Sequence, residues 1–235
     1  MVVIHYTEMA SAELAIGWLC NPASRVSAHY LVAADGTVTA MVEESRRAWH
    51  AGVSGWDGTS DVNSRSIGIE LDSPGHAPSP PTFPDAQIAA LIDLLDGVRS
   101  RWPVPPRNVV AHSDVAPLRK IDPGELFPWA CLAEAGHAIH VPPQPGSGGI
   151  DVFALRIALA SAGYFLPLSM DGNGVKDALL EATVTAFHRR FLPNRVGAPA
   201  DAATLATARA FAAAVDADRR RHVFRRSSGR RLTER

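Results

Sequence analysis

The chain is poor in cysteine and contains no long apolar run. Its two cysteines, Cys20 and Cys131, lie far apart and form no CxxC pair. This spacing argues against a disulfide, and we expect both residues to be small buried hydrophobes. No apolar stretch reaches the length of about 20 residues that a membrane-spanning helix needs. At 235 residues the chain is long enough for one or two domains with full hydrophobic cores.

Two sequence patterns are also missing. There is no HExxH motif, so a metallopeptidase that acts on proteins has no support. There is no basic leader followed by an apolar core and a small-residue cleavage site. We therefore expect the chain as written to be cytoplasmic. The cell envelope or periplasm is the alternative if the first residue is mis-assigned or the chain is truncated.

Lysine is scarce, with two lysines against 21 arginines, and the net charge of −1 hides a basic end. Residues 219–235 hold eight arginines and one glutamate, a charge of +7. We expect the tail at 216–235 to be disordered and solvated. The alternative is an arm that binds anionic polymers or lipid.

Strand-like and helix-like segments alternate along residues 1–140. Apolar or alternating runs predict strands, and apolar residues at helical spacing predict helices. Asp35-Gly36, between two such runs, predicts a β-hairpin. The alternation predicts an α/β fold in which helices cover a central sheet. We expect strands at 2–5, 28–32, 37–42, 66–71 and 109–111, and helices at 11–19 and 84–102.

A second region follows a linker rich in proline and glycine at 141–149. Apolar residues there recur at helical spacing in three segments, which begin near Val152, Leu180 and Leu205. The pattern predicts a three-helix unit at 150–215. A unit of about 65 residues is close to the lower size at which one core suffices.

The segment from Ala111 to Gly124 carries the most chemistry. It holds His112 and Asp122 on a stretch punctuated by proline and glycine, which predicts a loop that can turn both side chains toward one point. His5 is a second imidazole on a predicted buried strand. Two histidines and an aspartate can bind a catalytic zinc and leave a fourth position for water, although other first-row metals also fit. Each histidine taken alone could equally be an ordinary core or surface residue.

Lys120 and Glu70 are the candidates for catalysis. A compact ammonium two residues before Asp122 can approach a developing oxyanion beside a metal. Glu70 closes the SIGIE run, where a carboxylate can act as a general base at the mouth of a site. The alternatives are a plain surface lysine and an exposed glutamate at a strand end.

Several short motifs occur in order along residues 3–124, and together they resemble the type-2 family of zinc-dependent N-acetylmuramoyl-L-alanine amidases. The resemblance covers residues 1–140. It implies a mixed central β-sheet flanked by helices, a fold shared with peptidoglycan recognition proteins. The motifs are Val3-Ile4-His5-Tyr6-Thr7, Ser27-Ala28-His29-Tyr30-Leu31-Val32, Ala48-Trp49-His50-Ala51-Gly52, Asn63-Ser64-Arg65-Ser66-Ile67-Gly68-Ile69-Glu70, His112-Ser113-Asp114-Val115-Ala116-Pro117 and Lys120-Ile121-Asp122-Pro123-Gly124.

The resemblance also implies the chemistry. One zinc ion per chain would be held by His5, His112 and Asp122, with Glu70 and Lys120 as catalytic residues. The reaction would be hydrolysis of the amide between the lactyl group of N-acetylmuramic acid and L-alanine of the stem peptide, in peptidoglycan or muropeptides. The alternative is a non-catalytic peptidoglycan recognition module on the same fold, which needs no general base.

The helical region resembles a peptidoglycan-binding module over 155–164 and 184–191, although His188 stands where that module usually has glutamine. We therefore expect four parts along the chain. They are a zinc amidase catalytic domain at 1–140, a linker at 141–149, a peptidoglycan-binding-like helical domain at 150–215 and a basic tail at 216–235.

Four residues are expected to border the substrate groove: His50, Trp56, Asn63 and Arg65. Trp56 could stack on a sugar or peptide face, and Arg65 could pair with a stem-peptide carboxylate. Loop packing and a solvated charge are the alternatives. As partners we expect peptidoglycan or muropeptide substrate, no nucleic acid and no membrane span, with the chain a monomer.

Overall fold

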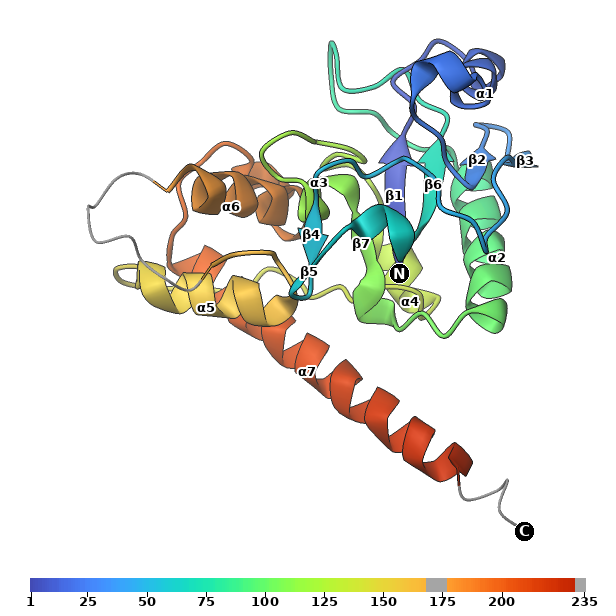
Figure 1. The fold of residues 1–235 in the computed structure, drawn as a ribbon. Coiled ribbons are helices and arrows are strands. Elements are labelled where there is room, and N and C mark those ends of the chain that lie inside the picture. The colour runs from blue at the N-terminus through green and yellow to red at the C-terminus, as the bar shows by residue number, and fades with distance from the viewer. Residues whose placement is uncertain (168–176, 231–235) are drawn as a thin grey trace.

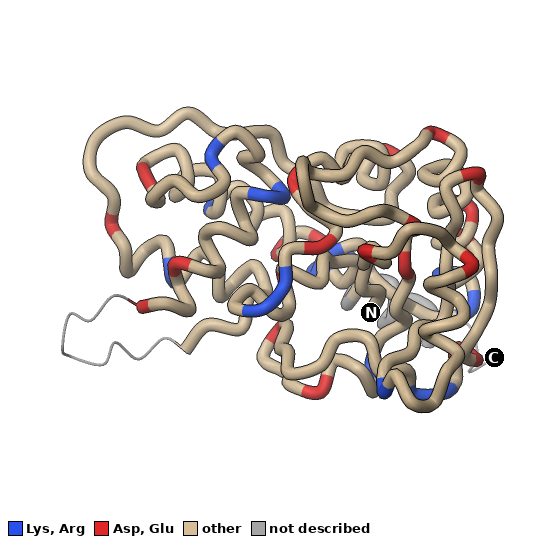
Figure 2. Tube along the Cα trace, turned by 90° about the horizontal axis from the view of Figure 1, so that it is seen from above, with Lys and Arg blue, Asp and Glu red and all other residues tan. Residues whose placement is uncertain are grey.

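The structure is a computed structural model that describes residues 1–167 and 177–230, with the backbone alone for 223–230. Figure 1 shows two parts side by side: a sheet part, residues 1–140, and a helical part, residues 150–230. The last helix projects well beyond the body of the molecule (Figure 1). Acidic and basic positions are spread over both parts (Figure 2), so charge does not separate one part from the other.

The sheet part is built on a mixed five-stranded sheet. Its order is β3-β2-β6-β1-β7, which places β1 between two strands that follow it in the chain. The β1–β6, β1–β7 and β2–β6 pairs are parallel, and the β2–β3 pair is antiparallel. This confirms the predicted mixed sheet. The strands are β1 (Val2–Tyr6), β2 (Tyr30–Val32), β3 (Val38–Ala40), β6 (Ile67–Leu71) and β7 (Val109–Ala111), and a separate hairpin pairs β4 (Gly55–Trp56) with β5 (Thr59–Ser60).

Three of the helices, α1, α5 and α6, start where a polar side chain caps them. Ser11, Asp151 and Asp177 each accept a backbone N–H in the first turn of the helix that follows, which satisfies a donor that the helix itself cannot. The helices are α1 (Ala12–Leu19), α2 (Asp85–Arg101), α3 (His112–Val115), α4 (Trp129–Glu134), α5 (Val152–Ala162), α6 (Ala178–Phe191) and α7 (Ala202–Arg230), with 3-10 turns at Pro22–Ser24, Val62–Ser64, Pro106–Asn108 and Pro193–Arg195.

Alternate residues of the central strand enter two different cores. Val2 and Ile4 of β1 pack on one face of the sheet, in the core that includes the apolar side of α2. Val3 and Val110 pack on the other face, in the core that includes α5, α6 and α7. The two-residue period of a strand produces this division. The helical part therefore packs on the sheet face opposite α2.

The second core runs through both parts of the molecule. Val3 and Ala51 of the sheet part belong to the same buried cluster as Leu155, Phe187 and Phe211 of the helical part. The domain boundary at 141–149 stays a prediction. Around it, the two parts share buried apolar surface and are not joined by a linker alone.

The expected strands and helices of the sheet part are present, with ends within two residues of the predicted ones. Three elements were not predicted: the hairpin β4–β5, the one-turn helix α3 and the short helix α4. Each is six residues or shorter, too short for a hydrophobic period to show. Within the described residues, none of the helices combines the length and apolarity needed to cross a membrane.

Two predictions about the surface were wrong. Cys20 and Cys131 are free thiols as expected, but they are exposed and not buried. Residues 216–230 continue α7 and do not form a disordered tail, while 231–235 lie outside the described residues. Alanine and arginine in this stretch favour helix. In addition, Asp218 and Arg219 form ion pairs of 2.7 Å with the sheet part.

Candidate metal centre

Three side chains from distant parts of the sequence converge at one point. His5 Nδ1 lies 2.9 Å from His112 Nδ1 and 3.2 Å from Asp122 Oδ2, and His112 Nδ1 lies 2.9 Å from the same oxygen. All three residues are buried. Ligands about 2.0–2.1 Å from a tetrahedral zinc lie about 3.3 Å apart, so these separations fit one ion. Among the described residues, no other cluster of histidine, cysteine and acidic side chains is arranged to hold a metal.

The hydrogen bonds made by the Nε2 atoms of His5 and His112 determine whether the Nδ1 atoms that face this point carry a proton. His112 Nε2 lies 3.2 Å from the carbonyl oxygen of Ala51, which can only accept a hydrogen bond. A neutral His112 therefore carries its proton on Nε2, and its Nδ1 presents a lone pair. The Ser66 hydroxyl donates to the carbonyl of Val62, so its oxygen accepts from His50 Nε2. Nδ1 of a neutral His50 therefore accepts from His5 Nε2 at 3.0 Å, and His5 Nδ1 also presents a lone pair. Two lone pairs and a carboxylate oxygen that face one another repel unless a cation lies between them, so this donor set fits a divalent metal.

The electrostatics keep His5 and Asp122 in their metal-binding forms. Burial and the neighbouring His112 lower the pKa of His5 to about 4. Burial alone would raise the pKa of Asp122, but the imidazoles of His112 and His5 hold it well below its usual range. A neutral imidazole and an ionised carboxylate are the forms that coordinate a metal.

The sheet geometry explains how these residues meet. His5 on β1 and Glu70 on β6 are paired in register. Their neighbours Ile4 and Ile69 belong to the α2 core, so both His5 and Glu70 lie on the opposite face. His112 follows β7 directly, as the first residue of α3 and not within a loop as predicted. The N–H of Ser113 donates to the carbonyl oxygen of Asp122 at 3.0 Å and joins the two ligand segments.

Glu70 and Lys120 lie close enough to the metal ligands for their charges to interact with them. Burial, followed by the charge of Asp122, raises the pKa of Glu70 well above its usual range, and Lys120 opposes that rise. Lys120 also acts on His5, where its charge lowers the pKa. Glu70 Oε2 is buried and has no hydrogen-bond partner among the described residues. The arrangement offers a proton acceptor and a cation beside three metal-ligand atoms.

His50 faces the metal ligands and no open groove. Its ring is buried, with Nδ1 toward His5 and Nε2 3.1 Å from Ser66 Oγ. Ser66 in turn donates to the carbonyl oxygen of Val62 at 2.6 Å. A Cβ at Gly68 would lie 2.4 Å from the His50 ring, so the ring needs a glycine beneath it. These hydrogen bonds hold the outer nitrogen of His5 in place.

Trp56 and Asn63 serve the structure at the positions where we expected substrate contacts. Trp56 is 3% exposed, and its ring packs edge-to-face on Tyr164 of the helical part, with centroids 5.1 Å apart. It presents no free ring face for stacking on a sugar. Asn63 Oδ1 accepts the N–H groups of His50 and Ala51 at 3.1 and 2.7 Å. The amide therefore clamps the segment that contacts both metal-ligand imidazoles.

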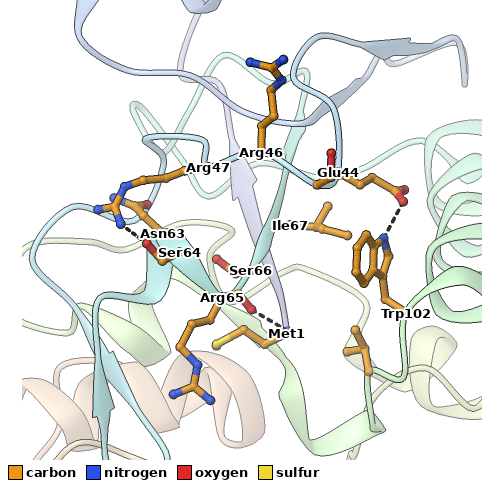
Figure 3. Close-up of a pocket in the computed structure, with 12 residues that line it drawn as sticks. Met1, Glu44, Arg46, Arg47, Asn63, Ser64, Arg65, Ser66, Ile67 and Trp102 are labelled. Carbon is orange, nitrogen blue, oxygen red and sulfur yellow. Dashed lines mark hydrogen bonds between the residues drawn. The ribbon is translucent and has the colours of Figure 1, made fainter.

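Arg65 lies away from the metal ligands, beside a cavity of about 410 Å³ (Figure 3). Ile67, at the start of β6, lines the same cavity, whereas Glu70 stands near the other end of that strand. The side chains of Arg46 and Arg65 point in opposite directions in Figure 3. Arg46 and Arg47, which also line the cavity, each pair with a carboxylate.

Sequence reasoning missed two features of the site. Gly68 interrupts an apolar strand, and a glycine in a strand often marks a close approach. Asp114 could not be recognised as a structural residue, because its partners Tyr164 and Arg190 lie 50 and 76 residues away.

Comparison with known proteins gives consistent matches. A protein family described as N-acetylmuramoyl-L-alanine amidase matches residues 1–125. The N-acetylmuramoyl-L-alanine amidase AmiD of Escherichia coli (strain K12) is 35% identical over 238 residues, which cover 89% of this chain and 81% of AmiD. The 1,6-anhydro-N-acetylmuramyl-L-alanine amidase AmpD of Haemophilus influenzae is 42% identical over 106 residues, 45% of this chain and 55% of AmpD.

Solved structures show the same relationship over most of the chain. A complex of E. coli AmiD with anhydro-N-acetylmuramic acid-L-Ala-D-gamma-Glu-L-Lys superposes with a TM-score of 0.78 at 35% identity, and covers 90% of this chain and 87% of that one. AmpDH3 from Pseudomonas aeruginosa superposes with a TM-score of 0.74 at 31% identity, with 90% of each chain covered. Both matches extend over the sheet part and into the helical part.

Proposed function

The chain belongs to the family of N-acetylmuramoyl-L-alanine amidases, which are hydrolases, and from this premise we propose how it acts. It hydrolyses the amide between the lactyl group of N-acetylmuramic acid and L-alanine of the stem peptide, with one zinc ion per chain held by His5, His112 and Asp122. The observation that carries the zinc site is the convergence of two imidazole nitrogens and one carboxylate oxygen within 3.2 Å of one another.

The residues around the ligands divide the chemistry among them. His5, His112 and Asp122 would hold a zinc ion that would act as a Lewis acid toward the scissile carbonyl. Glu70 takes a proton from the attacking water and delivers it to the departing alanine nitrogen. The raised pKa of Glu70 suits this role, because the carboxyl must hold the proton between the two steps. The ammonium of Lys120 stabilises the negative charge that develops on the carbonyl oxygen.

The substrate we propose is any fragment that carries this amide. The AmiD complex contains anhydro-N-acetylmuramic acid joined to a tripeptide, and the AmpD relatives are named for anhydro-muropeptides. Free muropeptides and the intact polymer share the same scissile bond. The compartment, cytoplasm or cell envelope, decides which of the two the enzyme meets, and it stays a prediction, as does the monomeric state.

The division into a catalytic part at 1–140, a linker at 141–149 and a helical part with a peptidoglycan-binding role at 150–215 is retained as a proposal, whereas the separate tail is not, since 216–230 continue α7. The resemblance that suggests it departs from the usual pattern at His188, which is buried and bonded to the carbonyl of Arg195 and the hydroxyl of Thr204. That histidine is thus fully occupied within the helical part. Co-sedimentation of a full-length Glu70→Gln variant with insoluble peptidoglycan tests this proposal, and binding to soluble muropeptides alone would contradict it.

A muropeptide digestion assay with zinc analysis tests the proposed function. Wild type should bind one zinc and release the peptide with a free L-alanine amino group. Glu70→Gln should bind zinc and fold as wild type, but lose hydrolysis by about 10²-fold or more. Glu134→Gln, at an exposed position on α4, is the matched control and should keep full activity. Zinc-free turnover, or turnover that survives Glu70→Gln, would favour a different mechanism, and binding without turnover would favour the recognition module.

A further inference from the structure

Helix α6 of the helical part reaches both segments that carry metal ligands. Arg190 Nη1 donates to Asp114 Oδ2 at 2.7 Å, and Asp114 is two residues after His112. The preceding residue, Arg189, places its Nε 3.9 Å from Glu125 Oε2, three residues after Asp122. Two consecutive arginines of one helix therefore contact the two segments that carry His112 and Asp122.

The carboxylate of Asp114 accepts three hydrogen bonds. Its Oδ2 accepts the N–H of Ala111 at 2.9 Å as well as Arg190, and its Oδ1 accepts the hydroxyl of Tyr164 at 2.8 Å. Asp114 is 1% exposed. Its helix α3 is a single turn of four residues, which is too short to be stable on its own. The orientation of His112 at the start of α3 thus depends on what the helical part donates to Asp114.

Besides Asp114, Arg190 contacts three other residues of the sheet part. Its Nη2 donates to the carbonyl oxygens of Ile139 and Val109 at 3.1 and 3.4 Å, and its guanidinium lies 3.9 Å from the ring centroid of Trp129. It is 4% exposed. A buried ion pair adds little net stability compared with an apolar replacement. A planar guanidinium that donates from both Nη1 and Nη2 does fix the geometry of its partners, and this makes orientation its main effect.

We propose that the helical part positions the metal ligands: Arg190 of α6 and Tyr164, which follows α5, orient His112 through Asp114, and Arg189 of α6 steadies Asp122 through Glu125. The inference rests on the proposed zinc site. It gives the helical part a role in the catalytic centre that is separate from any binding of peptidoglycan. Arg189, Arg190 and Tyr164 are positioning residues, since none of them lies against the metal-ligand atoms.

Matched arginine-to-lysine variants of the full-length protein test the proposal. Arg190→Lys keeps the charge but loses the planar fork. Arg156→Lys is the control, because Arg156 is also 4% exposed in the helical part, but it binds Asp177 and the carbonyl of Pro167, away from the ligand loops. Tyr164→Phe removes a single hydroxyl and keeps the buried ring, which makes it the variant least able to disturb folding.

The readouts are the zinc dissociation constant from chelator competition and the visible spectrum of the cobalt-substituted protein. Arg190→Lys should weaken zinc binding about 10–100-fold, and Tyr164→Phe should do so at the lower end of that range. Both should shift the cobalt spectrum, since the ligand field changes. Arg189→Gln should have a smaller effect, because its contact is 3.9 Å long. Arg156→Lys should lower the melting temperature and leave zinc affinity and spectrum unchanged.

Three results would overturn the inference. If Tyr164→Phe and Arg190→Lys bind zinc as wild type does while melting lower, the contacts are structural only and the inference is overturned. If Arg156→Lys weakens zinc binding as much as Arg190→Lys, general loosening of the helical part explains the effect and the inference also falls. If wild type binds no zinc, the proposed function fails first and the inference with it.

Discussion

Replacing Gly68 by alanine tests how His50 holds the ligand His5. The new Cβ would lie 2.4, 2.6 and 2.7 Å from three atoms of the His50 ring. Carbon atoms in ordinary contact are about 3.5 Å apart or more, so the ring has to move by about 1 Å. The 3.0 Å hydrogen bond between His5 Nε2 and His50 Nδ1 then stretches beyond hydrogen-bonding distance.

Two effects of different size follow from this displacement. Crowding a packed interior lowers the free energy of unfolding by about 1–3 kcal/mol. Loss of an outer hydrogen bond to a metal-ligating histidine weakens metal binding about 10–100-fold. We therefore expect Gly68→Ala to fold, to melt at a lower temperature and to bind zinc about 10–100-fold more weakly.

A double-mutant cycle with His50→Ala isolates the cause. Removing the ring opens the space that the methyl group needs, so the double variant should bind zinc within about 2-fold of His50→Ala alone. Zinc affinity is measured by chelator competition, and stability by thermal unfolding of the metal-free protein. The reasoning is refuted if Gly68→Ala binds zinc as tightly as wild type, or if it weakens zinc binding equally with alanine at position 50.

Three further predictions concern other parts of the sheet part. Lys120→Ala should lower kcat about 10²–10³-fold with zinc still bound, because one oxyanion-stabilising group is lost; unchanged turnover by the zinc-loaded variant would remove Lys120 from the mechanism. Asn63→Ala should lower the free energy of unfolding by about 2 kcal/mol in urea titrations, since two buried N–H groups lose their acceptor; a loss below about 0.5 kcal/mol would contradict this. Hydrogen bonding to Arg101 holds the pKa of Glu44 at about 2, compared with 4.5 when unpaired. The resulting stability is present above pH 4.5 and is lost as the pH falls toward 2. Glu44→Gln should therefore be less stable than wild type by about 1–2 kcal/mol at pH 6, after allowance for solvent screening, with the gap closing toward pH 2; a gap that does not change with pH would show that the carboxylate charge is not involved.

The regular elements were predictable because their signals are local. The apolar run around Ile4 and the helical period of Ile88, Leu91 and Leu95 each lie within one window of sequence. The grouping of His5 with His112 could be predicted only through the order of family motifs, since 107 residues separate them and no local pattern relates them.

The roles of His50 and Trp56 could not be predicted, because the direction of a side chain depends on distant partners. Trp56 has the composition of a sugar-stacking residue, but Tyr164 of the helical part covers its ring. His50 directly precedes Ala51 in an unpaired segment, and the packing of its ring over Gly68 together with its contact with Ser66 turns it toward His5. The continuation of α7 past residue 215 was missed for the same reason, since Asp57 and Arg107 stabilise it from the sheet part.

The strand order also has a consequence for synthesis. During translation, β1 leaves the ribosome before either of the strands that flank it, and β6 begins roughly 65 residues later. At about 5–20 residues per second, Val2–Tyr6 waits several seconds with its apolar side chains unpaired. Arg190 emerges later still. The nascent protein should therefore rely on chaperones to shield its first strand, and metal loading should be among the last events in its maturation.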